Sequence, residues 1–98
     1  MHKMSHELIT KITSPAVQKS ALLDVQPNGY ALLVAISRYA IREGEWSIIT
    51  NESLCDVLGY KVVSALHKIR EKCISEGWLE YDNQAAGKEG RYRVIIKA

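Results

Sequence analysis

The sequence predicts one small α+β domain that is mostly helical. Its 98 residues are the length of a single domain, and 47% apolar with 24% charged residues is an ordinary globular composition. Apolar residues recur at helical spacing through the middle of the chain, whereas its last part reads as two strands around a turn. Phe is absent, so Leu, Ile, Val, Trp and Tyr must fill the core.

In the N-terminal part, the sequence predicts one helix and leaves the secondary structure of the first residues undecided. Residues 1–14 fit either a short strand or a frayed helix. Ser14 is a good N-cap and Pro15 suits a first helical turn. A helix is therefore predicted over residues 15–23.

A mostly buried helix is predicted next, over residues 30–42, where Leu33 and Ile36 share one face. Gly44 is expected to end it in the left-handed capping conformation. The β-branched run that follows is too short for a helix and predicts a strand over residues 45–49.

Two more helices are predicted, joined by a tight turn. Thr50 is the expected N-cap of the first, which Gly59 ends after about two turns. Such a short helix needs a neighbour, and residues 61–76 provide one that ends at Gly77. Its expected buried stripe repeats at spacings of four, three and four: Val62, Leu66, Ile69 and Cys73.

An antiparallel hairpin is predicted at the end of the chain. Residues 78–82 and 91–96 read as strands, and the segment 83–90 between them is polar, small and turn-forming. Trp46 and Trp78 each begin a predicted strand, and both are expected in the core.

The order of these elements resembles the winged helix-turn-helix family over residues 28–97. The segment NESLCDVLGYKVVSALHKIREKCISEGWLEYD has the family's capped helix ending in Leu-Gly, its second helix, and a Gly-Trp-Leu that enters the wing. Where the family pattern has Ser or Thr with Arg, this chain has Tyr-Lys-Val-Val at 60–63. Within the family the chain looks most like DNA-binding domains of phage and plasmid replication proteins and small regulators.

The resemblance implies a three-helix core with a C-terminal β-hairpin wing over residues 27–98, preceded by an N-terminal extension over residues 1–26. It also implies that the helix 61–76 lies in the major groove of duplex DNA and that the wing 83–93 contacts phosphates. In the helix, Lys donates to guanine, Ser to several bases, and the Ala methyl meets a thymine methyl. The predicted DNA-binding residues are Tyr60, Lys61, Ser64, Ala65, His67, Lys68 and Lys72 on the turn and helix, and Lys88, Arg91 and Arg93 on the wing.

The charge distribution is consistent with a nucleic-acid face. Residues 59–98 hold eight Lys and Arg against five acids, whereas residues 1–58 hold five against six. The sequence thus predicts a small duplex-DNA-binding protein, either a transcriptional regulator or a replication or mobile-element accessory factor.

The alternative is a winged-helix protein–protein adaptor that does not bind DNA. Five acids interleaved with the basic residues of the C-terminal part favour it. A homodimer is also expected, because residues 1–26 contain more apolar side chains than a simple tail needs. These are Leu8, Ile9, Ile12, Val17, Leu22 and Leu23.

No enzyme, cofactor or metal site is predicted. The sequence has neither a glycine-rich phosphate loop nor a nucleophile–base pattern. Cys55 and Cys73 lie 18 residues apart without a CxxC pair, so buried free thiols are expected rather than a zinc site. Without an apolar run of membrane-spanning length or a signal-peptide pattern, the expected location is the cytoplasm.

Overall fold

The computed structural model describes residues 7–40, 43–83 and 89–97, and in these it contains four helices and a small antiparallel sheet of three strands. The prediction of a mostly helical α+β domain is therefore confirmed. The elements follow in the order α1 (Glu7–Ile12), α2 (Pro15–Ser37), β1 (Ser47–Thr50), α3 (Asn51–Leu58), α4 (Val63–Ser75), β2 (Leu79–Asp82) and β3 (Glu89–Val94).

Helix α2 is longer than predicted, because it joins the helix expected at 15–23 to most of the one expected at 30–42. A kink divides it at Gln26, whose φ of 69° and ψ of 172° are not helical. Pro27 follows, and a proline disfavours the helical conformation of the residue before it. The open choice at the N-terminus is resolved in favour of a helix for residues 7–12, which form α1, and residues 1–6 lie outside the described part of the chain.

The end of α2 was predicted too late in the chain. The helix stops at Ser37, whose hydroxyl donates a hydrogen bond to the Leu33 carbonyl at 2.7 Å, and Arg38 takes the cap position. Gly44 does have a left-handed φ of 85°, as expected. It lies beyond the helix end, however, and so does not cap it. Residues 41–42 lie outside the described part of the chain.

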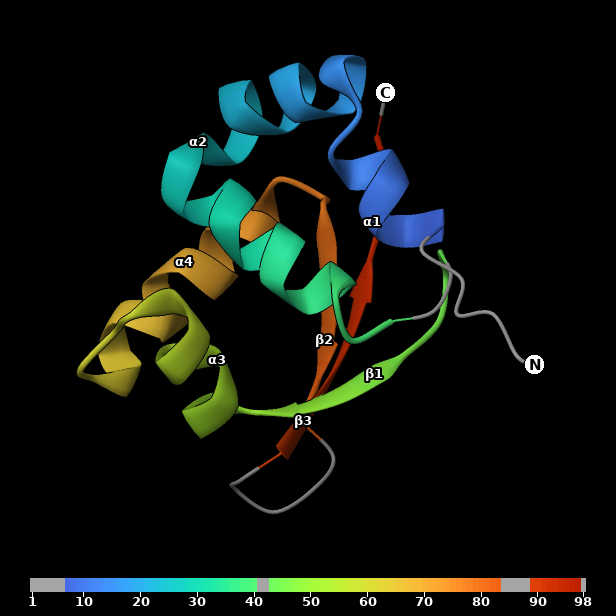
Figure 1. Cartoon of the computed structure of the whole chain (residues 1–98). Helices are drawn as coiled ribbons and strands as arrows, with labels where there is room; N and C mark the ends of the chain where they lie inside the picture. Colours follow the sequence, from blue (N-terminus) through green and yellow to red (C-terminus); the bar gives the residue numbers. More distant parts are fainter. Residues whose placement is uncertain (1–6, 41–42, 84–88, 98) are drawn as a thin grey trace.

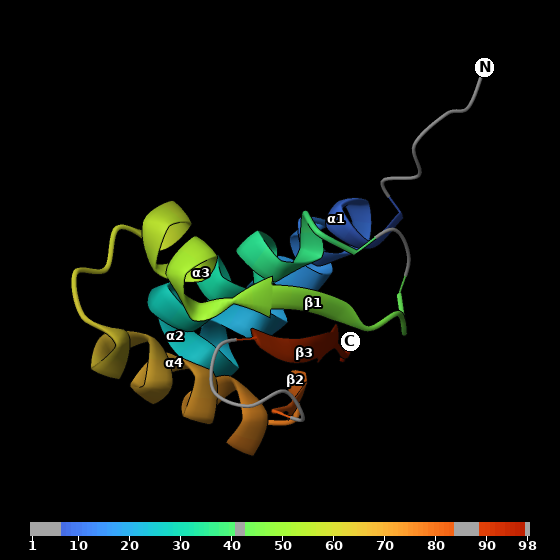
Figure 2. The same ribbon diagram turned by 90° about the horizontal axis from the view of Figure 1, so that it is seen from below.

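The sheet has the order β1–β3–β2, so β3 is its central strand and not the edge of a two-stranded hairpin. Ser47 and Tyr81 both pair with Tyr92, and Leu79 pairs with Val94. The inner face of the sheet is fully buried at Tyr92 and nearly so at Val94. In Figures 1 and 2 the helices gather over this face and at one end of the sheet, where β1 leads directly into α3.

The N-terminal helices belong to the core of the same chain. Tyr30 donates its hydroxyl hydrogen to the Ile12 carbonyl at 2.9 Å, and the Trp78 indole donates to Asp24 at 2.8 Å. Trp78 is completely buried, as predicted. Among the apolar residues that suggested a dimer contact, some are buried within the chain and Leu23 is 75% exposed; the buried ones are Leu8, Ile12 and Val17.

Both cysteines are buried free thiols, as expected. Burial raises the pKa of Cys73 from 9.0 to about 12, so this thiol stays protonated at neutral pH and packs as an apolar group. Its sulfur lies 3.5 Å from the Gly29 carbonyl oxygen, to which it donates a weak hydrogen bond. In the described residues, no helix combines the length and apolar character needed to cross a bilayer.

Candidate nucleic-acid interface

The helix pair α3–α4 forms through the local signals that the sequence predicted. Thr50 caps α3, because its hydroxyl oxygen accepts a hydrogen bond from the Ser53 backbone N–H at 3.0 Å. Gly59 ends α3 with a left-handed φ of 77°. The Tyr60 N–H donates a hydrogen bond to the Cys55 carbonyl oxygen at 2.9 Å and so completes the C-cap.

Helix α4 begins at Val63, two residues later than predicted, and the difference changes the role of Val62. Val62 is the N-cap, with an extended backbone and no side-chain capping bond. It is therefore outside the buried stripe and 58% exposed, contrary to the prediction. The rest of the stripe is confirmed, since Leu66 and Cys73 are buried and Ile69 is partly buried.

Lys61, on the turn before α4, and Ser64, His67 and Lys68, on the first half of α4, are all exposed. Neither Lys61 nor Lys68 forms a hydrogen bond or ion pair with another described residue. The sequence contains no acid between Asp56 and Glu71, so this stretch has no carboxylate of its own. Its lysines are therefore free to meet an external anion.

The remaining predicted residues of the helix differ in their surroundings. Lys72 lies 3.9 Å from Glu76 one helical turn on, so its charge is partly offset. Ala65 and Tyr60 are half-buried. Tyr60 packs against the core, and burial is the main cause of its raised pKa.

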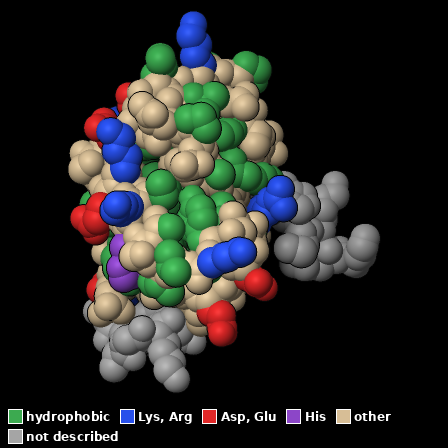
Figure 3. All heavy atoms as spheres, turned by 90° about the vertical axis from the view of Figure 1, so that its left-hand side faces the viewer, with side chains coloured by type: hydrophobic (Ala, Val, Ile, Leu, Met, Phe, Trp, Pro, Cys, Tyr) green, Lys and Arg blue, Asp and Glu red, His purple; other side chains and the backbone are tan. Residues whose placement is uncertain are grey.

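Figure 3 shows the molecule from the left-hand side of Figure 1, the side of α2, α3 and α4. Apolar side chains form a band along this face, and lysine and arginine side chains lie around it. The acidic side chains in view lie toward the edges of the face. The same face thus combines apolar and cationic groups.

Arg70 fixes α4 against the sheet from inside, a role that the helical period did not predict. It is only 6% exposed, and its Nη1 donates to Tyr92 Oη at 2.8 Å and to Asn51 Oδ1 at 3.1 Å. Its guanidinium carbon lies 4.2 Å from the centre of the Tyr81 ring. One side chain on α4 thereby contacts β2, β3 and the start of α3.

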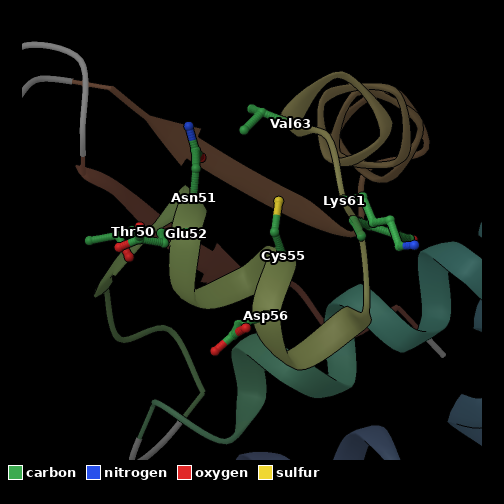
Figure 4. Close-up of a pocket in the computed structure, with 8 residues that line it drawn as sticks. Thr50, Asn51, Glu52, Cys55, Asp56, Lys61 and Val63 are labelled. Atoms are coloured by element: carbon green, nitrogen blue, oxygen red, sulfur yellow. The ribbon is translucent and has the colours of Figure 1, made fainter.

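A cleft of about 580 Å³ separates the first part of α3 from the start of α4. In Figure 4, Cys55 and Val63 point into this space from opposite sides, and Glu52 and Asp56 also line it. Asn51 lies at one end of the cleft, and its side-chain Oδ1 accepts the hydrogen bond from Arg70. The leading end of α4 is therefore open to solvent on the side that faces α3.

The outer face of the sheet places Arg91 and Arg93 among carboxylates. Arg91 Nη2 lies 2.5 Å from Asp82 Oδ2, and Arg93 Nε donates to Glu80 Oε1 at 2.6 Å. Each pair is directly opposite in the strand register. These arginines share a strand face, as predicted, but their charge is largely matched within the chain. Lys88 lies outside the described residues.

Trp46 is on this outer face, so its predicted place in the core was wrong. Its side chain is partly exposed, and the guanidinium carbons of Arg93 and Arg91 lie 4.5 and 5.0 Å from its ring. In β1, Ser47 is buried and Ile48 is 64% exposed, whereas Ile49 is buried. The position of Trp46 just before a strand therefore did not decide which face of the sheet it lies on.

Comparison of the chain with family models, with curated proteins and with solved structures finds no match in any of the three. Among the residues that the structure describes, no group of three His, Cys, Asp or Glu side chains is arranged to hold a metal ion.

Proposed function

We propose that the chain is a winged helix-turn-helix protein that binds duplex DNA through α4. The supporting architecture is the second part of α2 with α3 and α4 as a three-helix core, followed by β2 and β3 as the wing. In helix-turn-helix proteins the second helix of the pair enters the major groove, which is wide enough to admit a helix. Here that helix is α4.

The observation on which the proposal depends is the unpaired positive charge of Lys61, on the turn before α4, and of Lys68, on its first half. Lys61 and Lys68 are exposed, lie next to Ser64 and His67, and have no ion pair with a described residue. Unpaired lysines release counterions when they meet phosphates, which is the main source of nonspecific DNA affinity. Ser64 and His67 add hydrogen-bonding groups for base edges or phosphates.

Arg91 and Arg93 contribute less in this proposal than the sequence suggested. Their carboxylate partners must be displaced or must share the guanidinium with a phosphate, so the gain per arginine is smaller. The wing then steadies the complex after α4 has entered the groove. A second copy of the chain adds phosphate contacts, as expected for a small regulator or replication accessory factor.

A protein–protein adaptor is the second candidate, and the outer face of the sheet favours it. Its arginines form ion pairs with carboxylates of the same face, and the exposed side chain of Ile48 and the partly exposed one of Trp46 add apolar area. A surface of this kind repels DNA phosphates less than an acidic one but attracts them little.

The proposal is tested by fluorescence anisotropy of the full chain with a labelled random-sequence duplex across a salt series. Because α4 offers Lys61, Lys68 and the partly offset Lys72, the log–log slope expected for one bound copy is about −2 to −3. A slope of about −4 to −5 would mean that the wing arginines also release counterions. Absence of duplex binding at low salt would overturn the proposal and favour the adaptor.

A further inference from the structure

The leading end of α4 exposes two valines where helix stability favours polar residues. Val62 is 58% exposed at the N-cap and Val63 is 40% exposed at the first helical position. An N-cap without a side-chain acceptor costs about 1 kcal/mol relative to Ser, Thr, Asp or Asn. The valine at the N-cap therefore does not contribute to the stability of the helix start.

The charges around these valines are mixed. Lys61 precedes them directly, Lys68 follows within α4, and the nearest acids in the sequence are Asp56 and Glu71. Glu52 and Asp56 line the cleft that Val63 faces, on the side of α3 (Figure 4). An occupant of this surface must thus offer apolar groups to the valines, and its negative charge must lie on the α4 side, at Lys61 and Lys68.

We infer that Val62 and Val63 read thymine 5-methyl groups in the major groove of duplex DNA, an inference that rests on the proposed function. The major groove has one apolar group among its polar base edges, the methyl of thymine, and it is bordered by phosphates on both sides. With α4 entering by its first turn, the valines meet the methyl groups and the lysines meet the phosphates. The substrate class is accordingly duplex DNA with thymines, or other 5-methylpyrimidines, facing this turn.

The size of the effect follows from the apolar area covered. Each methyl group removed from water contributes about a four-fold gain in affinity. Two valines that together cover one or two methyl groups therefore predict a preference of roughly four- to fifteen-fold for thymine over uracil. Uracil lacks only the 5-methyl group, so the phosphates and base-pairing edges stay the same.

The test measures anisotropy of the full chain with matched short duplexes. One pair has the same A·T-rich sequence with thymine or with uracil; the other has the same G·C-rich sequence with cytosine or with 5-methylcytosine. Wild type is expected to prefer the methylated member of both pairs. The second pair separates methyl contact from the narrow minor groove of A·T tracts.

The variant Val62→Ser/Val63→Ser is expected to bind both members of each pair equally. Serine is a good N-cap and has a helix propensity similar to valine, so α4 should remain folded. Val57→Ser makes the same change at a valine that is 55% exposed on α3, and it should keep the preference.

Equal, salt-dependent binding of thymine and uracil duplexes by wild type would overturn this inference and leave the proposed function standing. A methyl preference that survives in the double serine variant would also overturn it, because other residues would then read the methyl groups. Absence of binding to every duplex would overturn the proposed function and this inference with it.

Discussion

Replacing Lys61 and Lys68 together with glutamine is expected to weaken duplex DNA binding roughly 100-fold at about 50 mM salt. Lys61 lies on the turn before α4 and Lys68 on its first half; both are exposed and have no ion pair with a described residue. At this salt concentration each phosphate contact is worth a little more than a factor of ten. Anisotropy titrations should also show a log–log salt slope that is smaller by about two.

A matched control removes the same two charges elsewhere. Lys19 lies on α2 and Arg38 at its end, and both are exposed. The variant Lys19→Gln/Arg38→Gln should bind DNA within a few-fold of wild type, because only long-range charge is lost. Equal losses in the two double variants would contradict binding through α4 and indicate a general effect of net charge.

Charge reversal at Arg91 and Arg93 is a less suitable test of the wing. Glutamates there would lie directly opposite Asp82 and Glu80 in the strand register. Like charges in that position destabilise a sheet, so lost binding would not separate a contact from a folding defect. Substitution by glutamine avoids the repulsion.

Arg70→Ala is expected to destabilise the protein by roughly 3 kcal/mol, the largest stability effect among the charged residues. The substitution removes hydrogen bonds to Tyr92 and Asn51 and leaves a void beside the Tyr81 ring. The substitution also removes the desolvation cost of burying the guanidinium, which offsets part of this loss. Urea unfolding followed by circular dichroism measures the change, and the thermal midpoint should fall by more than about 10 °C.

A double-mutant cycle with Tyr92→Phe isolates the buried hydrogen bond. The single Tyr92→Phe change should cost about 1 kcal/mol, and its effect should become smaller in the Arg70→Ala background because the partner is already absent. Arg70→Met keeps most of the volume without the charge and should be less destabilised than Arg70→Ala. Additive effects of Arg70→Ala and Tyr92→Phe would show that the two side chains are not coupled.

Much of α3 and α4 was predictable from sequence because their signals are local. Thr50 and Gly59 act through hydrogen bonds between residues within a few positions of each other. The helical spacing of apolar residues in α4 predicts the buried positions of Leu66 and Cys73 correctly. The exposed position of Lys68 follows from the same period. The helix start was misjudged by two residues, since Val62 lacks a capping side chain.

The sheet was less predictable because its pairing is long-range. Pairing of β1 with β3 joins residues about 40 positions apart, from Thr50 with Glu89 to Ser47 with Tyr92, and no local pattern encodes it. That pairing turns the predicted hairpin into a three-stranded sheet and places Trp46 beside Arg93 on the outer face. The ion pair between Arg93 and Glu80 likewise depends on strand register.

Arg70 was missed for a different reason. A helical period treats a charged residue as exposed, whereas the aromatic ring of Tyr81 and the hydroxyl of Tyr92 make a buried site for its guanidinium. Only the packing of α4 on the sheet brings these groups together.

The most direct test of binding through α4 is an amide-resolved NMR titration of the full chain with a short duplex. Chemical-shift changes are expected to concentrate at residues 60–68, the turn and the first half of α4. Smaller changes are expected on the outer face of the sheet. Changes confined to β1 and β3, with α4 unaffected, would contradict the account and place the DNA or the partner on the sheet.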